Sequence, residues 1–219
     1  MKQELKTVYF ISGLGADSRA FSYLDLSFCN PVYLPWQIPE KNESIENYAL
    51  RYKSLITGTR PILIGLSFGG MLAMEIAKYI QFSKIIIISS AKTRKELPFY
   101  LRAMKYIPIH RLIKPQNLKQ LNNLAYKFLR VHLRKDKVVC MQMIRESDNR
   151  LVSWTIDSIV NWKNNLVALN TIHIHGSHDI LLPHFFVKAD HKIAKGRHMI
   201  PMIEPEKISA LLKQIILNA

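Results

Sequence analysis

The sequence is poor in cysteine, in long apolar runs and in acidic residues. Two cysteines, Cys29 and Cys140, occur among the 219 residues, and they form no CxxC pair. One disulfide is possible at most, and we expect instead two free, buried thiols in a reducing compartment. Apolar runs such as Ile85–Ile88 are far shorter than the roughly 20 residues that a membrane-spanning helix needs.

The N-terminal residues also lack the pattern of a secretory signal peptide. Residues 1–6 are mostly polar and lead directly into Thr7–Ile11, which has the character of a strand. A signal peptide has a longer apolar stretch, of roughly 7–15 residues, followed by a small-residue cleavage site. We therefore expect a cytoplasmic protein.

Acidic residues are about half as frequent as basic ones, and the imbalance is concentrated in one region. The chain has 31 Lys and Arg against 16 Asp and Glu, for a net charge of +15. Residues 92–150 hold 15 basic and 4 acidic residues, whereas residues 1–91 hold 9 and 7 and residues 151–219 hold 7 and 5. A basic excess can serve nucleic acid, an anionic membrane surface, an acidic substrate or a solvated exterior. Nucleic acid is the weakest interpretation, because no nucleic-acid-binding motif accompanies the basic residues.

The composition, with 48% hydrophobic and 21% charged residues, is that of a globular protein of one domain. Apolar runs that end near Gly or Ser are Val8–Ile11, Ile62–Ile64, Ile85–Ile88 and Thr171–Ile174. Such runs are typical of parallel strands buried on both faces. Helical patterns lie at Ser44–Ile56, with Asn42 or Ser44 as its N-cap, at Phe68–Ile80 and at Glu204–Leu217. Strands that alternate with helices predict an α/β fold with a mostly parallel, doubly wound sheet.

The alternation stops between Lys92 and Leu166. This stretch contains several amphipathic helical segments, interrupted by prolines, and no convincing strand. We interpret it as a helical insertion between two strands of the sheet. The predicted organisation is a core of residues 1–91 and 167–219 with a helical cap of residues 92–166.

The sharpest local motif is Gly65-Leu66-Ser67-Phe68-Gly69, which matches G-x-S-x-G between a strand and a helix. A serine at such a turn lies in a strained backbone conformation that exposes its hydroxyl. Its neighbours two residues away must be small, because the strand and the helix nearly touch there. The motif therefore predicts a nucleophilic serine, although a glycine-rich turn that happens to contain serine is the simpler alternative.

A nucleophilic serine needs a base and an orienting acid, and candidates follow in the order Ser, Asp, His. Asp179 comes just after the strand Thr171–Ile174, at the sheet edge where open α/β sheets bind ligands. His198 follows Gly196 in a loop before the last helix. Each residue alone could be an ordinary turn or surface residue, but together they predict Ser67, Asp179 and His198 as a catalytic triad.

Several segments together resemble the α/β-hydrolase superfamily, over nearly the whole chain. They are Ser12–Asp17, Gly65–Gly69, His175–Asp179 with Pro183, and Gly196–His198. The resemblance implies a serine hydrolase of the esterase, thioesterase or lipase kind, with the backbone amides of Leu14 and Phe68 as its oxyanion hole. It also implies that residues 92–166 are the lid. Ser12 stands where the superfamily commonly has His, but the donors are backbone groups and the change should not abolish the hole.

Two departures from the superfamily pattern stand out. The chain begins almost directly on the strand before the oxyanion loop, so the first two strands of the superfamily are expected to be absent. The interval between Asp179 and His198 is also short, which leaves Asp190 as a reserve candidate for the acid.

Two cofactor-related patterns carry less weight. His173, His175 and His178 could suggest zinc, but Ser177 stands where the HxHxDH pattern of zinc hydrolases has Asp, and we read these residues as strand-end and loop histidines. Gly13-x-Gly15 is only a fragment of a dinucleotide fingerprint. The sequence therefore predicts no metal and no cofactor.

These residues and motifs support one principal hypothesis and one alternative. The first is a serine hydrolase that cleaves an ester, thioester or amide of a small or acyl-chain substrate. The alternative is a binding module on a hydrolase scaffold, which docks an anionic membrane or an acidic partner through its basic lid.

Overall fold

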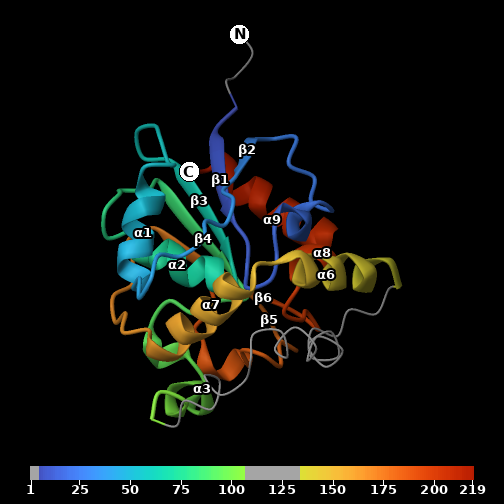
Figure 1. Cartoon of the computed structure of the whole chain (residues 1–219). Coiled ribbons are helices and arrows are strands. Elements are labelled where there is room, and N and C mark those ends of the chain that lie inside the picture. The colour runs from blue at the N-terminus through green and yellow to red at the C-terminus, as the bar shows by residue number, and fades with distance from the viewer. Residues whose placement is uncertain (1–4, 107–133) are drawn as a thin grey trace.

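The computed structural model describes residues 5–106 and 134–219, whose backbone forms a six-stranded sheet with helices on both faces (Figure 1). The strand order is β2-β1-β3-β4-β5-β6, and every neighbouring pair is parallel. The strands are β1 (Thr7–Ile11), β2 (Asn30–Tyr33), β3 (Ile62–Leu66), β4 (Lys84–Ile88), β5 (Thr171–Gly176) and β6 (His191–Ile193). The helices are α1 (Ile45–Lys53), α2 (Phe68–Ile76), α3 (Phe99–Ala103), α6 (Arg134–Glu146), α7 (Asn149–Asn161), α8 (Ile200–Ile203) and α9 (Pro205–Leu217), with 3-10 turns at Ser18–Phe21, Arg94–Glu96 and His184–Phe186. The predicted doubly wound parallel sheet is confirmed.

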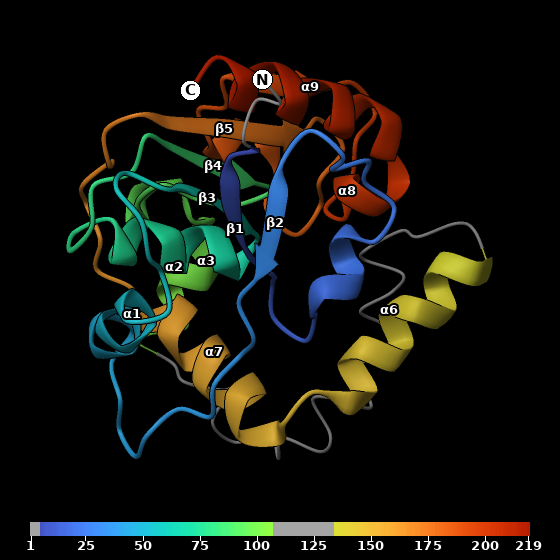
Figure 2. The ribbon, with the colours of Figure 1, turned by 90° about the horizontal axis from the view of Figure 1, so that it is seen from above.

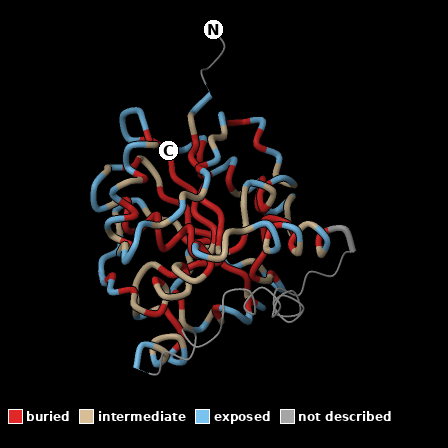
Figure 3. Tube along the Cα trace, viewed as in Figure 1, coloured by how far each residue is buried: buried red, intermediate tan, exposed pale blue. Residues whose placement is uncertain are grey.

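The central strands are buried along their length, as their apolar runs predicted. Every residue of β3 is buried, and β4 is buried from Ile85 to Ile88. In Figure 3 the buried trace runs through the middle of the sheet. The edge strand β6 differs, because its three residues are half-buried or exposed and form no apolar run. No sequence pattern predicted this strand, because a short edge strand without an apolar run has no periodic signal.

Each face of the sheet packs against its own set of helices. Alternate strand residues such as Phe10 and Ile64 pack with α8 and α9, whereas Tyr9 and Leu63 pack with α1 and α2. Figure 2 shows α9 on one side of the sheet and α1 and α2 on the other. The alternation follows from strand geometry, in which successive side chains point to opposite faces.

The helix boundaries follow local signals. Ser44 is the N-cap of α1, since its side chain accepts a hydrogen bond from the backbone N–H of Asn47. Asn42, the other predicted cap, lies instead in the left-handed region with a φ of 60°. Pro205 begins α9, as expected for the first turn of a helix. The helix after Ser67 ends at Ile76, earlier than the predicted end at residue 80.

The regular secondary structure described between β4 and β5 is helical, with no strand among the described residues of this segment. It contains α3, α6, α7 and the turn at Arg94–Glu96. Residues 107–133 lie outside the described residues, so the boundaries of a cap at residues 92–166 stay a prediction. Figure 2 shows α6 and α7 diverging from a turn near residue 148.

Two smaller observations concern the features that the sequence lacks. Cys29 and Cys140 are both free and buried. No described helix combines the length and the apolar character that crossing a membrane requires.

Candidate active site

Ser67 is the single residue between β3 and α2, and its backbone conformation is one that non-glycine residues rarely adopt. Its φ is 53° and its ψ is −120°. Two groups at the end of the neighbouring strand β4 and just after it hold this conformation. The carbonyl of Ile88 accepts the N–H of Ser67 at 2.8 Å, and the hydroxyl of Ser90 donates to the carbonyl of Ser67 at 2.6 Å. Such strain persists only where the surroundings enforce it and is typical of functional sites.

The two glycines of the motif are required by close contacts. A Cβ atom on Gly65 would lie 2.4 Å from the carbonyl oxygen of Gly69. A Cβ atom on Gly69 would lie 2.3 Å from the carbonyl oxygen of Ser12 at the end of β1. No side chain fits at either position. Because both residues are glycine, the backbones of β3, α2 and the loop after β1 can lie in close contact next to Ser67.

The structure brings Ser67, His198 and Asp179 into one chain of hydrogen bonds. The distance from Ser67 Oγ to His198 Nε2 is 2.8 Å, and that from His198 Nδ1 to Asp179 Oδ2 is 2.7 Å. Both His198 and Asp179 are buried. Because an ionised carboxylate can only accept, Nδ1 carries the hydrogen and Nε2 accepts the hydroxyl hydrogen of Ser67.

The Asp179 carboxylate is held by its own loop as well as by the histidine. Its Oδ1 accepts the backbone N–H groups of Leu181 and Leu182, each at 3.0 Å. Burial by itself would raise the pKa of this carboxyl. The charge and hydrogen bond of His198 and the N–H of Leu182 outweigh that effect, and the pKa lies below its ordinary value. Asp179 is therefore an anion at neutral pH.

Asp190, the reserve candidate, lies elsewhere. It is exposed and just precedes β6, where its Oδ2 accepts the backbone N–H of His173 at 2.8 Å. It joins the end of the loop to β5, whereas Asp179 has the hydrogen bond to His198.

The two predicted oxyanion residues flank Ser67 and line the same cavity. Phe68 is the first residue of α2, where the N–H groups of a helix lack intrahelical partners. Leu14 belongs to the loop after β1, which lies against Ser67, since a Cβ atom on Gly13 would lie 3.0 Å from Ser67 Cβ. The loop is braced by Ser12, whose hydroxyl donates to the carbonyl of Ala16 at 2.7 Å.

Trp36 contacts both of these segments, although no sequence pattern singled it out. Its indole N–H lies 2.9 Å from the hydroxyl of Ser12 and 3.0 Å from the carbonyl of Ala16. Its ring stacks on that of Phe68, with centroids 5.7 Å apart. One side chain thus joins the loop that contains Leu14 to the first residue of α2.

A cavity of about 710 Å³ is lined by Ser67 and His198. Its other described lining comes from the loop after β1, the ends of β3 and β4, the segment near α3, the loop after β5, and the helices α6 and α7. The residues of α6 and α7 in the lining are Cys140, Met143, Ile144, Val152, Ile156, Ile159 and Val160. Among the described lining residues there is no Lys, Arg, Asp or Glu.

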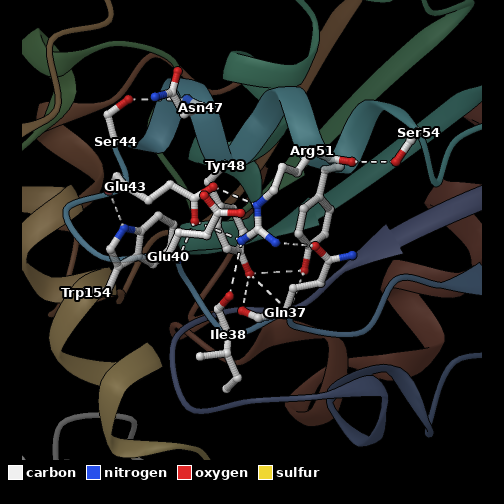
Figure 4. Close-up of polar contacts among 11 residues, drawn as sticks. Gln37, Ile38, Glu40, Glu43, Ser44, Asn47, Tyr48, Arg51, Ser54 and Trp154 are labelled. Atoms are coloured by element: carbon white, nitrogen blue, oxygen red, sulfur yellow. Dashed lines mark hydrogen bonds and ion pairs between the residues drawn. The ribbon is translucent and has the colours of Figure 1, made fainter.

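The α7 wall of this cavity is tied to α1 by a polar network, which Figure 4 shows in close-up. The indole N–H of Trp154 on α7 donates to the backbone carbonyl of Glu43 at 2.7 Å. The guanidinium of Arg51 holds the Glu43 carboxylate through two hydrogen bonds, of 2.7 and 2.8 Å. The Trp154 ring also packs on Tyr48, with centroids 4.2 Å apart.

The histidines of β5 are engaged with each other and with backbone. His175 Nε2 lies 2.8 Å from the carbonyl of Leu182, which can only accept, and His175 Nδ1 lies 3.1 Å from His173 Nε2. Burial lowers the pKa of both rings, that of His173 to about 3, so both are neutral at pH 7. His178 is exposed. Within the described ranges, no group of three His, Cys, Asp or Glu residues could hold a metal ion.

The comparisons with known proteins identify the fold. No protein family and no curated protein matches the sequence. Among solved structures, an esterase from Thermogutta terrifontis has a TM-score of 0.71 at 15% identity, with 98% of this chain and 90% of that one covered. A lipase-esterase related protein from Clostridium acetobutylicum has a TM-score of 0.74 at 16% identity, with 98% and 96% covered. An esterase from Exiguobacterium antarcticum has a TM-score of 0.73 at 14% identity, with 97% and 92% covered. These similarities show that the chain has the α/β-hydrolase fold.

Proposed function

We propose that this chain, which has the α/β-hydrolase fold, is a serine hydrolase that cleaves an ester, thioester or amide. In this proposal Ser67 is the nucleophile, His198 is the general base and acid, and Asp179 orients His198. The observation that carries the proposal is the chain of hydrogen bonds from Ser67 Oγ through His198 to Asp179, with distances of 2.8 and 2.7 Å.

The first half-reaction follows from this arrangement. Ser67 Oγ attacks the substrate carbonyl while its proton passes to His198 Nε2. Asp179 stabilises the resulting imidazolium through the hydrogen bond to Nδ1. His198 then gives the proton to the leaving group, the bond to the leaving group breaks, and an acyl group stays on Ser67.

The second half-reaction reuses the same groups. A water molecule gives a proton to His198 Nε2 as its oxygen attacks the acyl carbon. The tetrahedral intermediate collapses, the acid product leaves, and the proton returns to Ser67 Oγ.

The negative charge on the carbonyl oxygen needs hydrogen-bond donors at fixed positions. In the proposal these are the backbone N–H groups of Leu14 and Phe68, which line the cavity beside Ser67. The amino end of α2 adds the positive end of its helix dipole. Loss of one oxyanion donor typically lowers kcat by about 10²–10³-fold.

Esters are the first substrates to test. Solved structures that are similar to this chain include esterases from Thermogutta terrifontis and Exiguobacterium antarcticum, although their low identity extends only the fold to this chain. The predicted docking of an anionic membrane or acidic partner by the basic segment stays a prediction, since residues 107–133 of that segment lie outside the described residues.

The test combines active-site labelling with kinetics. A fluorophosphonate probe and p-nitrophenyl butyrate are applied to the wild type, to Ser67→Ala and to Ser54→Ala, a control at an exposed position on the last turn of α1. We expect the wild type and Ser54→Ala to react alike. Ser67→Ala should remain unlabelled and lose about 10⁴-fold or more in kcat. Folded wild type that neither reacts with the probe nor cleaves the ester would overturn the proposal.

A further inference from the structure

We infer that the cavity takes an uncharged, apolar acyl chain and that any anionic part of the substrate remains outside it. This inference rests on the proposed function, because it names the substrate of the same site. It is carried by the chemistry of the cavity wall and by the positions of the basic residues.

The wall of the cavity is apolar on almost every side. One side of the cavity, the sheet side, is formed at the ends of the strands and the start of α2, and it contributes Leu66 and Met71. The opposite side, formed by α6 and α7, is named the cap side, and it contributes the apolar residues of these helices given above. The segment around α3 adds Leu97, Leu101 and Met104. At about 710 Å³ the cavity is of the size that encloses a small organic molecule, and such a wall favours methylene groups by removing them from water.

Apart from Ser67 and His198, the few polar side chains of the described lining carry no positive charge. Ser90 donates to the carbonyl of Ser67, and the hydroxyl of Tyr100 lies 3.2 Å from the carbonyl of Leu181, to which it donates. Ser89 Oγ is buried without a hydrogen-bond partner in the described structure. A hydroxyl at this position can bind one neutral polar group, but it carries no positive charge.

Lys92 and Arg94, which lie in the sequence between two residues of the lining, have partners outside the cavity lining or at its edge. Arg94 donates to the carbonyls of Val160 and Trp162, at 3.0 and 2.6 Å, and so braces the end of α7. Lys92 pairs with Glu96 at 3.7 Å. Residues 92–150 carry most of the net charge of the chain, yet no described Lys or Arg reaches the lining. Among the described residues, the positive charge of this region is thus separate from the cavity lining.

The consequence for specificity is a penalty on a charged acyl group. A carboxylate at the end of the chain would enter an apolar wall without a partner, which is costly. Added methylene groups should have the opposite effect. Burial of one methylene corresponds to roughly fourfold in kcat/KM, which is the conversion of about 0.8 kcal/mol.

The experiment compares p-nitrophenyl esters matched in length and size. The monoester of suberic acid differs from the octanoate only by a carboxylate in place of the terminal methyl group, and the decanoate has as many non-hydrogen atoms as the suberate. We expect kcat/KM to rise from the acetate through the octanoate to the decanoate. The suberate should be at least about 100-fold poorer than the decanoate, a ratio that corresponds to ~2.7 kcal/mol.

A variant with a cation in the wall tests the cause. Ile156→Lys on α7, or Ile144→Lys on α6 if the first variant does not fold, should narrow the ratio between decanoate and suberate by about tenfold, the effect of one partly buried ion pair. Val138→Lys is the control, since Val138 lies on α6, is exposed and is not part of the lining. It should leave the ratio unchanged.

The outcomes separate this inference from the proposed function. Octanoate that is cleaved while the suberate is cleaved equally well would overturn the inference and leave the hydrolase standing. The same holds for a Val138→Lys variant that narrows the ratio as much as Ile156→Lys, because the charge would then act from outside the cavity. Absence of any ester cleavage together with absence of probe labelling would overturn the proposed function itself.

Discussion

The two sides of the cavity are built by different kinds of contact. On the sheet side, Ser67, His198 and Asp179 are joined by short hydrogen bonds, and backbone N–H groups hold the second carboxylate oxygen. On the cap side, α6 and α7 present apolar side chains to the cavity, with no charged group among the described lining residues. Directional bonds define one side, and non-directional packing defines the other.

This difference matches two separate tasks in the proposed reaction. Proton transfer requires atoms that remain within hydrogen-bond distance, so small displacements on the sheet side are costly. An apolar chain gains from any dry surface of about the right shape, so the cap side tolerates more variation. We therefore expect changes on the sheet side to lower kcat, and changes on the cap side to alter KM and chain-length preference.

The largest expected effect is that of Asp179→Asn on the sheet side. An amide would no longer fix the hydrogen on His198 Nδ1, and kcat should fall by about 10⁴-fold. Steady-state kinetics with p-nitrophenyl butyrate measure the loss. Asp190→Asn is the matched control, because this exposed carboxylate accepts the N–H of His173 and not of His198, and kcat should stay within about twofold. Equal losses in the two variants would contradict the assignment of Asp179 as the acid.

Trp36→Phe tests how the sheet side is braced. The variant keeps a ring next to Phe68 but removes the N–H that contacts Ser12 and Ala16. The loop with the Leu14 amide should then be held less firmly, and kcat should fall roughly tenfold with little change in KM, less than the loss of a whole oxyanion donor.

A tryptophan-to-phenylalanine change at Trp154, on the cap side, is the comparison for Trp36→Phe. Trp154→Phe removes the N–H that contacts Glu43, and kcat should change by about twofold at most. The melting temperature of both variants is measured to separate folding from catalysis. A loss of kcat in Trp154→Phe equal to that in Trp36→Phe would mean that the two sides of the cavity are not distinct.

Ile159→Ala tests the cap side directly. This residue of α7 lines the cavity, and its shortening removes apolar contact from an acyl chain. We expect KM for p-nitrophenyl octanoate to rise about fivefold, while kcat and the constants for the acetate stay unchanged. Leu169→Ala, at a position that is 87% exposed, is the control. A fall in kcat for both esters would argue that α7 positions the catalytic groups.

The smallest expected effect is on the pH dependence of the free energy of unfolding, and it comes from the buried His173 on β5. Burial lowers the pKa of His173 from its ordinary value of 6.5 to about 3, so the unfolded chain binds more protons than the native one between these values. The native state is fully stable with respect to this residue above pH 6.5. It loses about 1.4 kcal/mol per pH unit as the pH falls toward 3.

Urea unfolding at several pH values between 7 and 5 checks this expectation. His173→Gln, which can still donate to His175, should reduce the pH slope of the free energy of unfolding by about that amount. His178→Gln is exposed and should leave the slope unchanged. An unchanged slope in His173→Gln would show that the ring is not buried as a neutral group.

Much of the fold was predictable because its signals are local. The runs at β1, β3 and β4 are apolar almost throughout, and β5 adds two buried histidines to its isoleucines, because both faces of a central parallel strand are buried. The edge strand β6 was missed because its three residues, from His191 to Ile193, form no such run. Its pairing with β5 depends on a neighbour that only the folded chain supplies.

The candidate site also has a part that local sequence predicted and a part that it did not. The Gly65–Gly69 motif identified Ser67, because a tight turn between strand and helix restricts residue type within five positions of the chain. The role of Trp36 had no such signal. Its hydrogen bonds reach residues 24 and 20 positions away, and its ring meets Phe68 on another element.

The sequence alone determined three features: the order of Ser67, Asp179 and His198 along the chain, the parallel character of the sheet, and the concentration of positive charge in residues 92–150. Only the tertiary structure decided that His198 meets Ser67 across a separation of 131 residues, that Asp179 rather than Asp190 faces it, and that the wall above them is apolar. The physical reason is the range of the forces involved. Periodicity and turn geometry act between neighbours in the chain, whereas packing and hydrogen bonding join whichever groups the fold brings into contact.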